Sequence, residues 1–373
     1  MKRISGILMI MLLSITACST DDSGNGSGGT DTDAFDRGAM LAHWADNIIV
    51  PAFEAFEVSS QSLENATTAF VNDPSATTLS ALRNQYRDSY VQFQTVSMFE
   101  IGKAEEIGFR RFLNTYPTNA SAIESRVESG SYNLELSSSY VEQGFPAMDY
   151  LLYGLGNSEE TLQKFTSGEN AENYRNYLLD VAERINSLTA EVATAWQGDY
   201  RDQFVQNTSS SATGSVDRFS NDYVMYFEKF LRSGKIGYPA GAFTGTPSPE
   251  NAEAVYAGDL SKELYLTALE AFQDFYLGRG FNGSGTGPSY KQYLEYLDSM
   301  KDGADLNALI QNQFDAIEDQ SAQLDGNFKS QVQTNNTAML AAFDELQKAV
   351  VLLKVDMMQA LSISVDYVDS DGD

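Results

Sequence analysis

The sequence predicts an all-α protein, and three observations lead to this fold class. Apolar residues recur at spacings of three and four in many segments, which is typical of helices with one buried face. No long segment alternates apolar and polar residues as a half-buried strand would, apart from Ile363, Val365 and Tyr367. Hydrophobic residues make up 42% of the chain, with 21 Phe and 20 Tyr, enough to fill the cores of helical bundles.

The chain starts with a segment that reads as a targeting signal. Lys2 and Arg3 precede an apolar stretch, residues 7–15, that is too short to span a bilayer stably. The residues Ile-Thr-Ala-Cys that end at Cys18 resemble the lipobox of bacterial lipoproteins. We therefore expect residues 1–17 to be a signal peptide and Cys18 to be the lipidated first residue. An ordinary secretory signal with a chance cysteine is the alternative.

Residues 18–34 read as a flexible tether. No apolar side chain occurs from Ser19 to Asp33, and a coil of this length reaches on the order of 20 Å. Asp21 and Asp22 resemble the acidic export signal of surface lipoproteins in Bacteroidetes. This pattern places the protein in the cell envelope, anchored to the outer membrane on its periplasmic or its outer side.

The helices follow the tether in order. Met40, Trp44 and Ile48 share one helix face and lead into Pro51, which we expect to kink or break that helix. Later apolar stripes mark further helices. They consist of Leu82, Tyr86, Tyr90 and Phe93; Leu178, Val181, Ile185, Leu188, Val192 and Ala195; Tyr265, Leu269, Phe272 and Tyr276; Ile310, Phe314, Ile317, Leu324 and Phe328; and Phe343, Leu346, Val350, Leu353, Met357 and Leu361.

The connections suggest two helical domains, residues 35–206 and 207–373. The Ser-, Thr- and Gly-rich residues 207–215 are the best candidate for the boundary. A Gly-rich connection also occurs at residues 278–287. Residues 234–249 are too long and too rich in Gly, Pro and Thr for a plain helix link, so we expect a functional loop there. Residues 369–373 resemble a fragment of a calcium loop without its bidentate Glu, which favours a solvated acidic tail.

Charge and composition exclude several classes of protein. The 24 Lys and Arg against 52 Asp and Glu give a net charge of −28, and removing residues 1–17 with Lys2 and Arg3 gives 22 − 52 = −30. Such a chain is not a general nucleic-acid binder, and electrostatic docking on anionic lipid is disfavoured. Because His43 is the only histidine and Cys18 the only cysteine, multi-histidine zinc sites and thiol catalysis are disfavoured. We expect His43 to be a satisfied, partly buried side chain.

One segment carries the most specific signal. Residues 144–154, Gly-Phe-Pro-Ala-Met-Asp-Tyr-Leu-Leu-Tyr-Gly, resemble the hallmark of the imelysin family, Gly-x-His-x-x-Glu followed by Leu-Leu-aromatic-Gly. In that pattern His and Glu could hold a metal from one helix face. Here Pro146 stands at the His position and Asp149 at the Glu position. Proline has no ligand atom, so a metal site built on that histidine cannot exist in this chain.

The resemblance extends over nearly the whole mature chain. Residues 44–51 are similar to the family's first-helix pattern ending in Pro. Residues 221–232 and 234–241 are similar to the signature of its second domain, and residues 354–372 follow it as well. The resemblance implies two four-helix-bundle-like domains that face each other, with a site in the interdomain crevice.

Two acidic positions are the candidate metal ligands, Asp149 and Glu228. Asp149 either binds a ligand or stabilises the positive end of its own helix, near Pro146. Glu228 and Arg232 are spaced four apart, which also suits a helical surface pair. Carboxylates together with tyrosine hydroxyls suit hard cations such as iron or calcium.

Five further residues complete the candidate ligand-binding set. Arg232 and Lys235 stand beside glycines in a chain with few cations, and they could hold an anionic ligand or acidic groups. Asp222 could pair with Lys229 or Arg232, and Tyr226 reads as a core residue. Glu100 fits a solvated turn, or else it faces the crevice.

The leading interpretation is a ligand-binding lipoprotein of the imelysin-like class. The resemblance implies a role in iron or metal acquisition, with envelope uptake proteins as partners. Two alternatives stay open. One is a metallopeptidase, which Pro146 disfavours because a metal-bound water needs protein ligands. The other is a surface protein that binds glycans or proteins through aromatic side chains, for which 20 Tyr and 2 Trp provide material.

Overall fold

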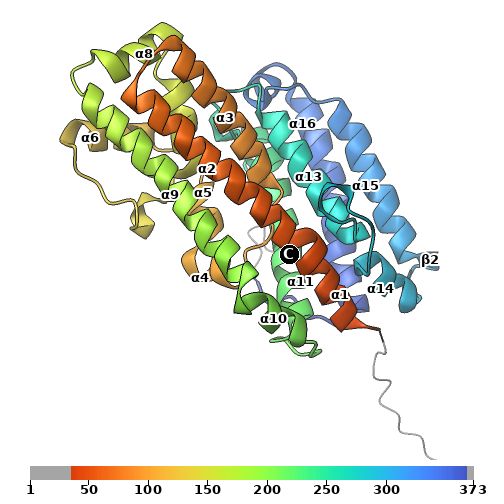
Figure 1. Ribbon diagram of the computed structural model, residues 1–373. Helices are drawn as coiled ribbons and strands as arrows, with labels where there is room; N and C mark the ends of the chain where they lie inside the picture. Colours follow the sequence, from red (N-terminus) through yellow and green to blue (C-terminus); the bar gives the residue numbers. More distant parts are fainter. Residues whose placement is uncertain (1–34, 368–373) are drawn as a thin grey trace, which may run out of the picture. The chain divides into compact units, whose positions relative to one another are not determined.

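The computed structural model describes residues 35–367 and confirms the all-α fold class (Figure 1). The predicted signal peptide, Cys18, the tether and the calcium-loop fragment at residues 369–373 lie outside the described residues. The chain from Asp36 onwards forms one compact unit. The boundary at residue 206 therefore stays a prediction, and we call residues 36–206 the N-terminal half and residues 207–367 the C-terminal half.

The N-terminal half consists of helices that vary widely in length. They are α1 (Arg37–Trp44), η1 (Ala45–Ile49), α2 (Val50–Asn72), α3 (Ala76–Gln94), α4 (Lys103–Ile107), α5 (Phe109–Leu113), α6 (Ala120–Ser129), η2 (Ser137–Glu142), α7 (Gly144–Asp149), η3 (Tyr150–Gly154), α8 (Ser158–Thr166), α9 (Ala171–Gln197) and α10 (Asp199–Gln206).

The C-terminal half adds further helices and one small hairpin. These elements are α11 (Ser215–Met225), η4 (Tyr226–Gly237), α12 (Tyr238–Ala240), η5 (Pro249–Asn251), α13 (Ser261–Leu277), η6 (Phe281–Gly283), α14 (Tyr290–Tyr296), β1 (Met300–Lys301), β2 (Ala304–Asp305), α15 (Leu306–Ala322), α16 (Phe328–Val350), η7 (Val351–Met357) and α17 (Met358–Ala360).

Long helices pack side by side within each half. In the N-terminal half, α2 packs along both α3 and α9, and in the C-terminal half α16 packs along α15 and η4 (Figure 1). The contact between α3 and α13 joins the two halves. The stripe of α13 is buried as predicted, and so is that of α9 except for Ala195, which is half-buried. None of the helices in residues 35–367 combines the length and apolarity needed to cross a bilayer.

The first helix, α1, packs against residues of the C-terminal half. Trp44 in α1 is fully buried, and its ring lies 4.9 Å from Phe275, 4.8 Å from Tyr290 and 5.6 Å from Phe219, measured between centroids. All three partners belong to the C-terminal half. This aromatic cluster ties the start of the chain into the second half.

Three local predictions need correction. Pro51 does not break its helix, because the π-helical segment η1 precedes it and Pro51 then sits in the first turn of α2, where a missing N–H costs little. The stripe 310–328 is divided between α15 and α16, and the Asn327 side chain caps α16 by accepting from Ser330 N. The predicted loop at 234–249 is helical through Ala240, within η4 and α12.

Candidate functional site

The segment that resembles the imelysin motif starts at Gly144, a position where only glycine fits. Gly144 has a φ of +72°, and a Cβ on it would lie 2.3 Å from the Leu113 carbonyl oxygen. A residue with a side chain disfavours this positive φ, and its Cβ would clash with the carbonyl oxygen. Pro146 follows within the first turn of α7, where its missing N–H is not needed. The short helix then ends at Asp149 and continues as the π-helical segment η3.

Asp149 reaches across to the C-terminal half. Its side chain is 1% exposed, and its two oxygens accept hydrogen bonds from Tyr256 N and Ala257 N, both at 2.9 Å. The prediction that Asp149 stabilises the start of its own helix is wrong, because its partners are backbone groups of another segment. Burial raises the pKa of Asp149 to about 7, and the two N–H groups oppose the rise.

A buried ion pair between Lys235 and Glu253 involves the same part of the C-terminal half, since Glu253 precedes Tyr256 by three residues. Lys235 Nζ donates to Glu253 Oε2 and, at 2.8 Å, to Gln94 Oε1. Lys235 is 3% exposed and Glu253 1% exposed. Burial lowers the pKa of Lys235, and Glu253 opposes the shift. Because Gln94 belongs to α3 and Lys235 to η4, this pair also bridges the halves.

The N-terminal half completes the surroundings of Glu253. Its Oε1 accepts hydrogen bonds from Asn114 Nδ2 at 2.7 Å and from Tyr90 Oη at 3.2 Å. Tyr86 lies beside Tyr90, with ring centroids 5.7 Å apart. We call the set that joins the halves here the inter-half network. It consists of Tyr86, Tyr90, Gln94, Asn114, Asp149, Lys235 and Glu253.

The Tyr86 hydroxyl is the one side-chain group of this network that makes no hydrogen bond of normal geometry. Tyr86 is fully buried, and its Oη has no partner of normal geometry. It nevertheless lies close enough to Asp149 to oppose the rise in the pKa of that carboxyl. Burial, with Asp149 adding to it, raises the pKa of Tyr86 well above its ordinary value. A buried hydroxyl without a partner costs about 1–3 kcal/mol.

Glu228 and Arg232 lie in a different cluster. Glu228 Oε2 accepts from Tyr367 Oη at 2.8 Å and pairs with Lys354 Nζ at 3.2 Å, while its Oε1 lies 3.8 Å from Arg232 Nη2. Arg232 also stacks over the Phe343 ring at 5.2 Å. The pair is not a surface pair, because both side chains are no more than 2% exposed. Asp149 and Glu228 share no partner among the described residues.

Asp222, Glu100 and Tyr226 form a third cluster around Arg110. Arg110 Nη2 lies 3.3 Å from both Asp222 oxygens, so Asp222 does not take Lys229 or Arg232 as its partner. Asp222 also accepts from Glu100 N at 2.9 Å. Tyr226 is buried as predicted, and the Arg110 guanidinium lies 5.1 Å from its ring centroid.

Glu100 is not in a solvated turn. Its Oε2 accepts from Arg110 N at 2.9 Å, and burial raises its pKa to about 7. It also lines a hollow of about 300 Å³ together with Asp222 and Tyr367. His43, in contrast, meets its prediction, since its Nε2 donates to the Gly278 carbonyl oxygen at 2.8 Å.

The candidate residues thus fall into three clusters instead of one pocket. Across residues 35–367, no group of three or more His, Cys, Asp or Glu side chains could hold a metal ion. Of the predicted set, Asp149 and Lys235 belong to the inter-half network, Glu228 and Arg232 to a second cluster, and Asp222, Glu100 and Tyr226 to the cluster around Arg110. Glu253 was not among the predicted residues, although it follows closely on residues 234–249, where we expected a functional loop.

Comparisons with known proteins identify relatives of this chain. A curated relative, iron-regulated protein A of Synechococcus elongatus, is 23% identical over 186 residues. That match covers 50% of this chain and 48% of the relative, so the chain spans about half the length of the curated relative it matches.

Two solved structures share the fold. The crystal structure of an iron-regulated protein A precursor from Parabacteroides distasonis has a TM-score of 0.71 at 17% identity, and that of an imelysin-like protein from Psychrobacter arcticum has 0.69 at 16%. Each superposition covers 89% of this chain and 97% of the other. The profile of the imelysin family matches residues 49–356, most of the sequence. This chain belongs to the imelysin family.

Proposed function

We propose that the protein is a non-enzymatic binding lipoprotein of the bacterial cell envelope with a role in iron acquisition. Its ligand is a hard metal cation held by oxygen atoms of the inter-half network. The observation that carries this proposal is the fully buried Tyr86 hydroxyl, which makes no hydrogen bond of normal geometry but lies close enough to the Asp149 carboxylate to oppose the rise in its pKa by hydrogen bonding. A cation bound there would supply the missing partner and would favour the ionised form of Asp149.

The donors of the network suit such a cation. Asp149 and Glu253 offer carboxylate oxygens, and Tyr86 and Tyr90 offer hydroxyl oxygens, the ligand types that hard cations prefer. Lys235 is the one cationic side chain of the network, so two ionised carboxylates leave a net negative charge. In this proposal the second carboxylate ligand, beside Asp149, is Glu253 and not Glu228.

The biological setting rests on two lines of support. The names of two related proteins describe them as iron-regulated. The lipobox-like residues that end at Cys18 and the polar residues 19–33 support attachment to the outer membrane through a lipid. We expect the partners to be envelope uptake proteins rather than nucleic acid.

The test adds Fe(III) citrate, Ca²⁺ or Zn²⁺ to the purified protein and follows thermal unfolding and the visible absorption spectrum. Binding to the folded state alone raises the free energy of unfolding by about 2.7 kcal/mol at a free cation concentration 100 times Kd. With Fe(III), a tyrosine ligand would also give a visible charge-transfer band. Tyr86→Phe should remove that band and leave the fold intact, because the Tyr86 hydroxyl makes no hydrogen bond of normal geometry and only its interaction with Asp149 would be lost.

Tyr265→Phe is the matched control. Tyr265 is also fully buried, but its hydroxyl hydrogen-bonds Ser321 Oγ at 2.9 Å, outside the network. The proposal fails if no cation changes the unfolding temperature, or if the two variants lose the band equally. Chelator-sensitive cleavage of an unfolded protein substrate would instead support the metallopeptidase alternative.

A further inference from the structure

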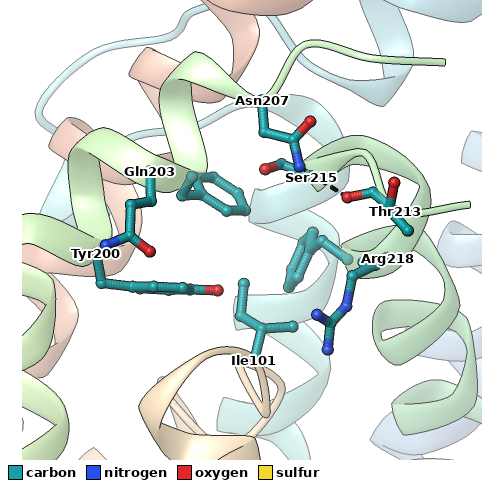
Figure 2. A pocket seen from close by; sticks show the side chains of 9 residues that line it. Ile101, Tyr200, Gln203, Asn207, Thr213, Ser215 and Arg218 are labelled. Atoms are coloured by element: carbon teal, nitrogen blue, oxygen red, sulfur yellow. Dashed lines mark hydrogen bonds between the residues drawn. The ribbon is translucent and has the colours of Figure 1, made fainter. Parts of the chain in front are cut away.

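A pocket lies where the chain passes from α10 to α11, next to the hollow that Glu100 and Asp222 line, with which it shares Ile101 and Arg218. It encloses about 190 Å³ and shares no residue with the inter-half network (Figure 2). Its floor consists of the buried side chains of Ile101, Phe204 and Phe219. One wall is the Ser-, Thr- and Gly-rich stretch that the sequence analysis treated as a domain boundary, through Asn207, Thr213 and Ser215. Residues 207–215 therefore form part of the pocket wall and do not only connect α10 to α11.

The polar groups of this pocket have unused hydrogen-bonding capacity. Within residues 35–367, the side chains of Tyr200, Gln203 and Ser215 make no hydrogen bond, although all three line the pocket. Figure 2 shows the Tyr200 hydroxyl pointing toward the middle of the pocket and Gln203 beside it. Together they offer hydroxyl and amide groups that can both donate and accept.

Tyr200 is held firmly in place. Its ring packs against Trp196, with centroids 4.9 Å apart. On another side lies Gly102, where a Cβ would come within 2.2 Å of the Tyr200 Cζ. Gly102 also has a φ of +60°, so the backbone there is suited to glycine. The wall of the pocket is thus preformed, which lowers the entropic cost of binding.

The pocket carries little net charge. Arg218 is the one charged side chain of its lining, and its Nη2 donates to Glu105 Oε2 in an ion pair. An anionic ligand would have to compete with Glu105 and would meet the field of a chain with a net charge of −28. The pocket therefore favours a neutral ligand over a charged one.

We propose that this pocket binds a neutral monosaccharide. Aromatic and aliphatic side chains offer a surface for the apolar C–H face of a sugar ring, and Tyr200, Gln203 and Ser215 offer groups for its hydroxyls. The enclosed volume corresponds to about six water molecules at ~30 Å³ each, which suits one sugar ring and not an oligosaccharide. This site would operate independently of the proposed cation site.

The test is saturation-transfer NMR on the purified protein with the methyl glycosides of glucose, galactose, mannose and N-acetylglucosamine. At least one glycoside should receive saturation transfer and bind with a measurable Kd. Gln203→Ala should weaken that binding about three- to tenfold, the loss expected for one neutral hydrogen bond. Tyr200→Phe should weaken it to a similar extent while leaving the packing of the ring in place.

Gln206→Ala is the matched control, because Gln206 is an exposed residue of the same helix that does not line the pocket. The proposal is supported if Gln203→Ala weakens binding and Gln206→Ala does not. It is overturned if no glycoside binds, or if both variants behave alike. The proposal would also be overturned if the pocket preferred inorganic phosphate or sialic acid, and if neither a neutral sugar nor a polyol competed with that binding.

Discussion

Arg110 contacts two carboxyl groups, those of Asp222 and Glu100, in different ways. It pairs directly with Asp222 through Nη2, whereas Glu100 receives only the Arg110 backbone N–H. Burial raises the pKa of both carboxyls, and that of Glu100 reaches about 7. Glu100 therefore changes its charge within the physiological range of pH.

This shift predicts a loss of stability as the pH rises. The pKa of Glu100 is higher in the folded state than the ordinary 4.5, so the folded state binds more protons between those values. The stabilisation is complete below about 4.5 and is lost as the pH rises through about 7. Glu100→Gln keeps an oxygen for the Arg110 N–H and cannot ionise. We expect it to be more stable than the unmodified protein at pH 8 by about 3 kcal/mol.

Urea denaturation between about pH 5 and pH 8 measures this difference. Glu106→Gln is the control, because Glu106 lies in the same part of the chain but its side chain is 66% exposed. The control should follow the unmodified protein over the whole range. An equal gain for both variants at pH 8 would show that general charge reduction, and not Glu100, is responsible.

At the scale of elements, α7 depends on how its first residue packs. Gly144→Ala adds a Cβ at a φ of +72° and 2.3 Å from a backbone oxygen. Backbone strain costs about 1–2 kcal/mol and overpacking about 1–3 kcal/mol, so we expect a loss of about 3 kcal/mol in urea denaturation. Gly245→Ala is the matched control, with a φ of +70° and no atom within 4 Å of its Cβ. It should lose only about 1 kcal/mol, and equal losses would refute the packing argument.

The helices were largely predictable, but their local winding was not. Periodicity located the faces of α9 and α13 because buried and exposed residues alternate there every three or four positions. The π-helical segment η4 spans Tyr226–Gly237, and four-residue spacing does not describe it. We expected Lys235 in a loop because residues 234–249 are rich in Gly, Pro and Thr, but it lies in η4 and its Nζ donates to Gln94 of α3.

At the scale of the whole molecule, the site depends on contacts between distant parts of the chain. Asp149 was identified because a local motif surrounds it. Glu253 was not, because its partners Tyr90, Gln94 and Asn114 are remote in sequence, and one sequence alone shows no such pairing. For the same reason the separate locations of Asp149 and Glu228 could not be predicted from their residue types.

We expect the two halves to unfold together, and the two tryptophans can test this. Trp44 reports on the aromatic cluster with Phe275 and Tyr290, and Trp196 reports on α9 and α10 through its contacts with Tyr200 and Phe204. They are the only two tryptophans, so Trp44→Phe and Trp196→Phe each leave one reporter.

Because residues from Asp36 onwards form one compact unit, we expect a single cooperative transition. In each variant, the urea midpoint from fluorescence should equal the midpoint from far-UV circular dichroism. Because both midpoints are measured on the same variant, the stability lost by replacing the tryptophan affects them equally and does not enter the comparison. Fluorescence midpoints that fall on opposite sides of the circular dichroism midpoint would mean that the halves unfold independently. That result would favour the boundary at residue 206, and it would make the buried Lys235 and Asp149 contacts too weak to couple the halves.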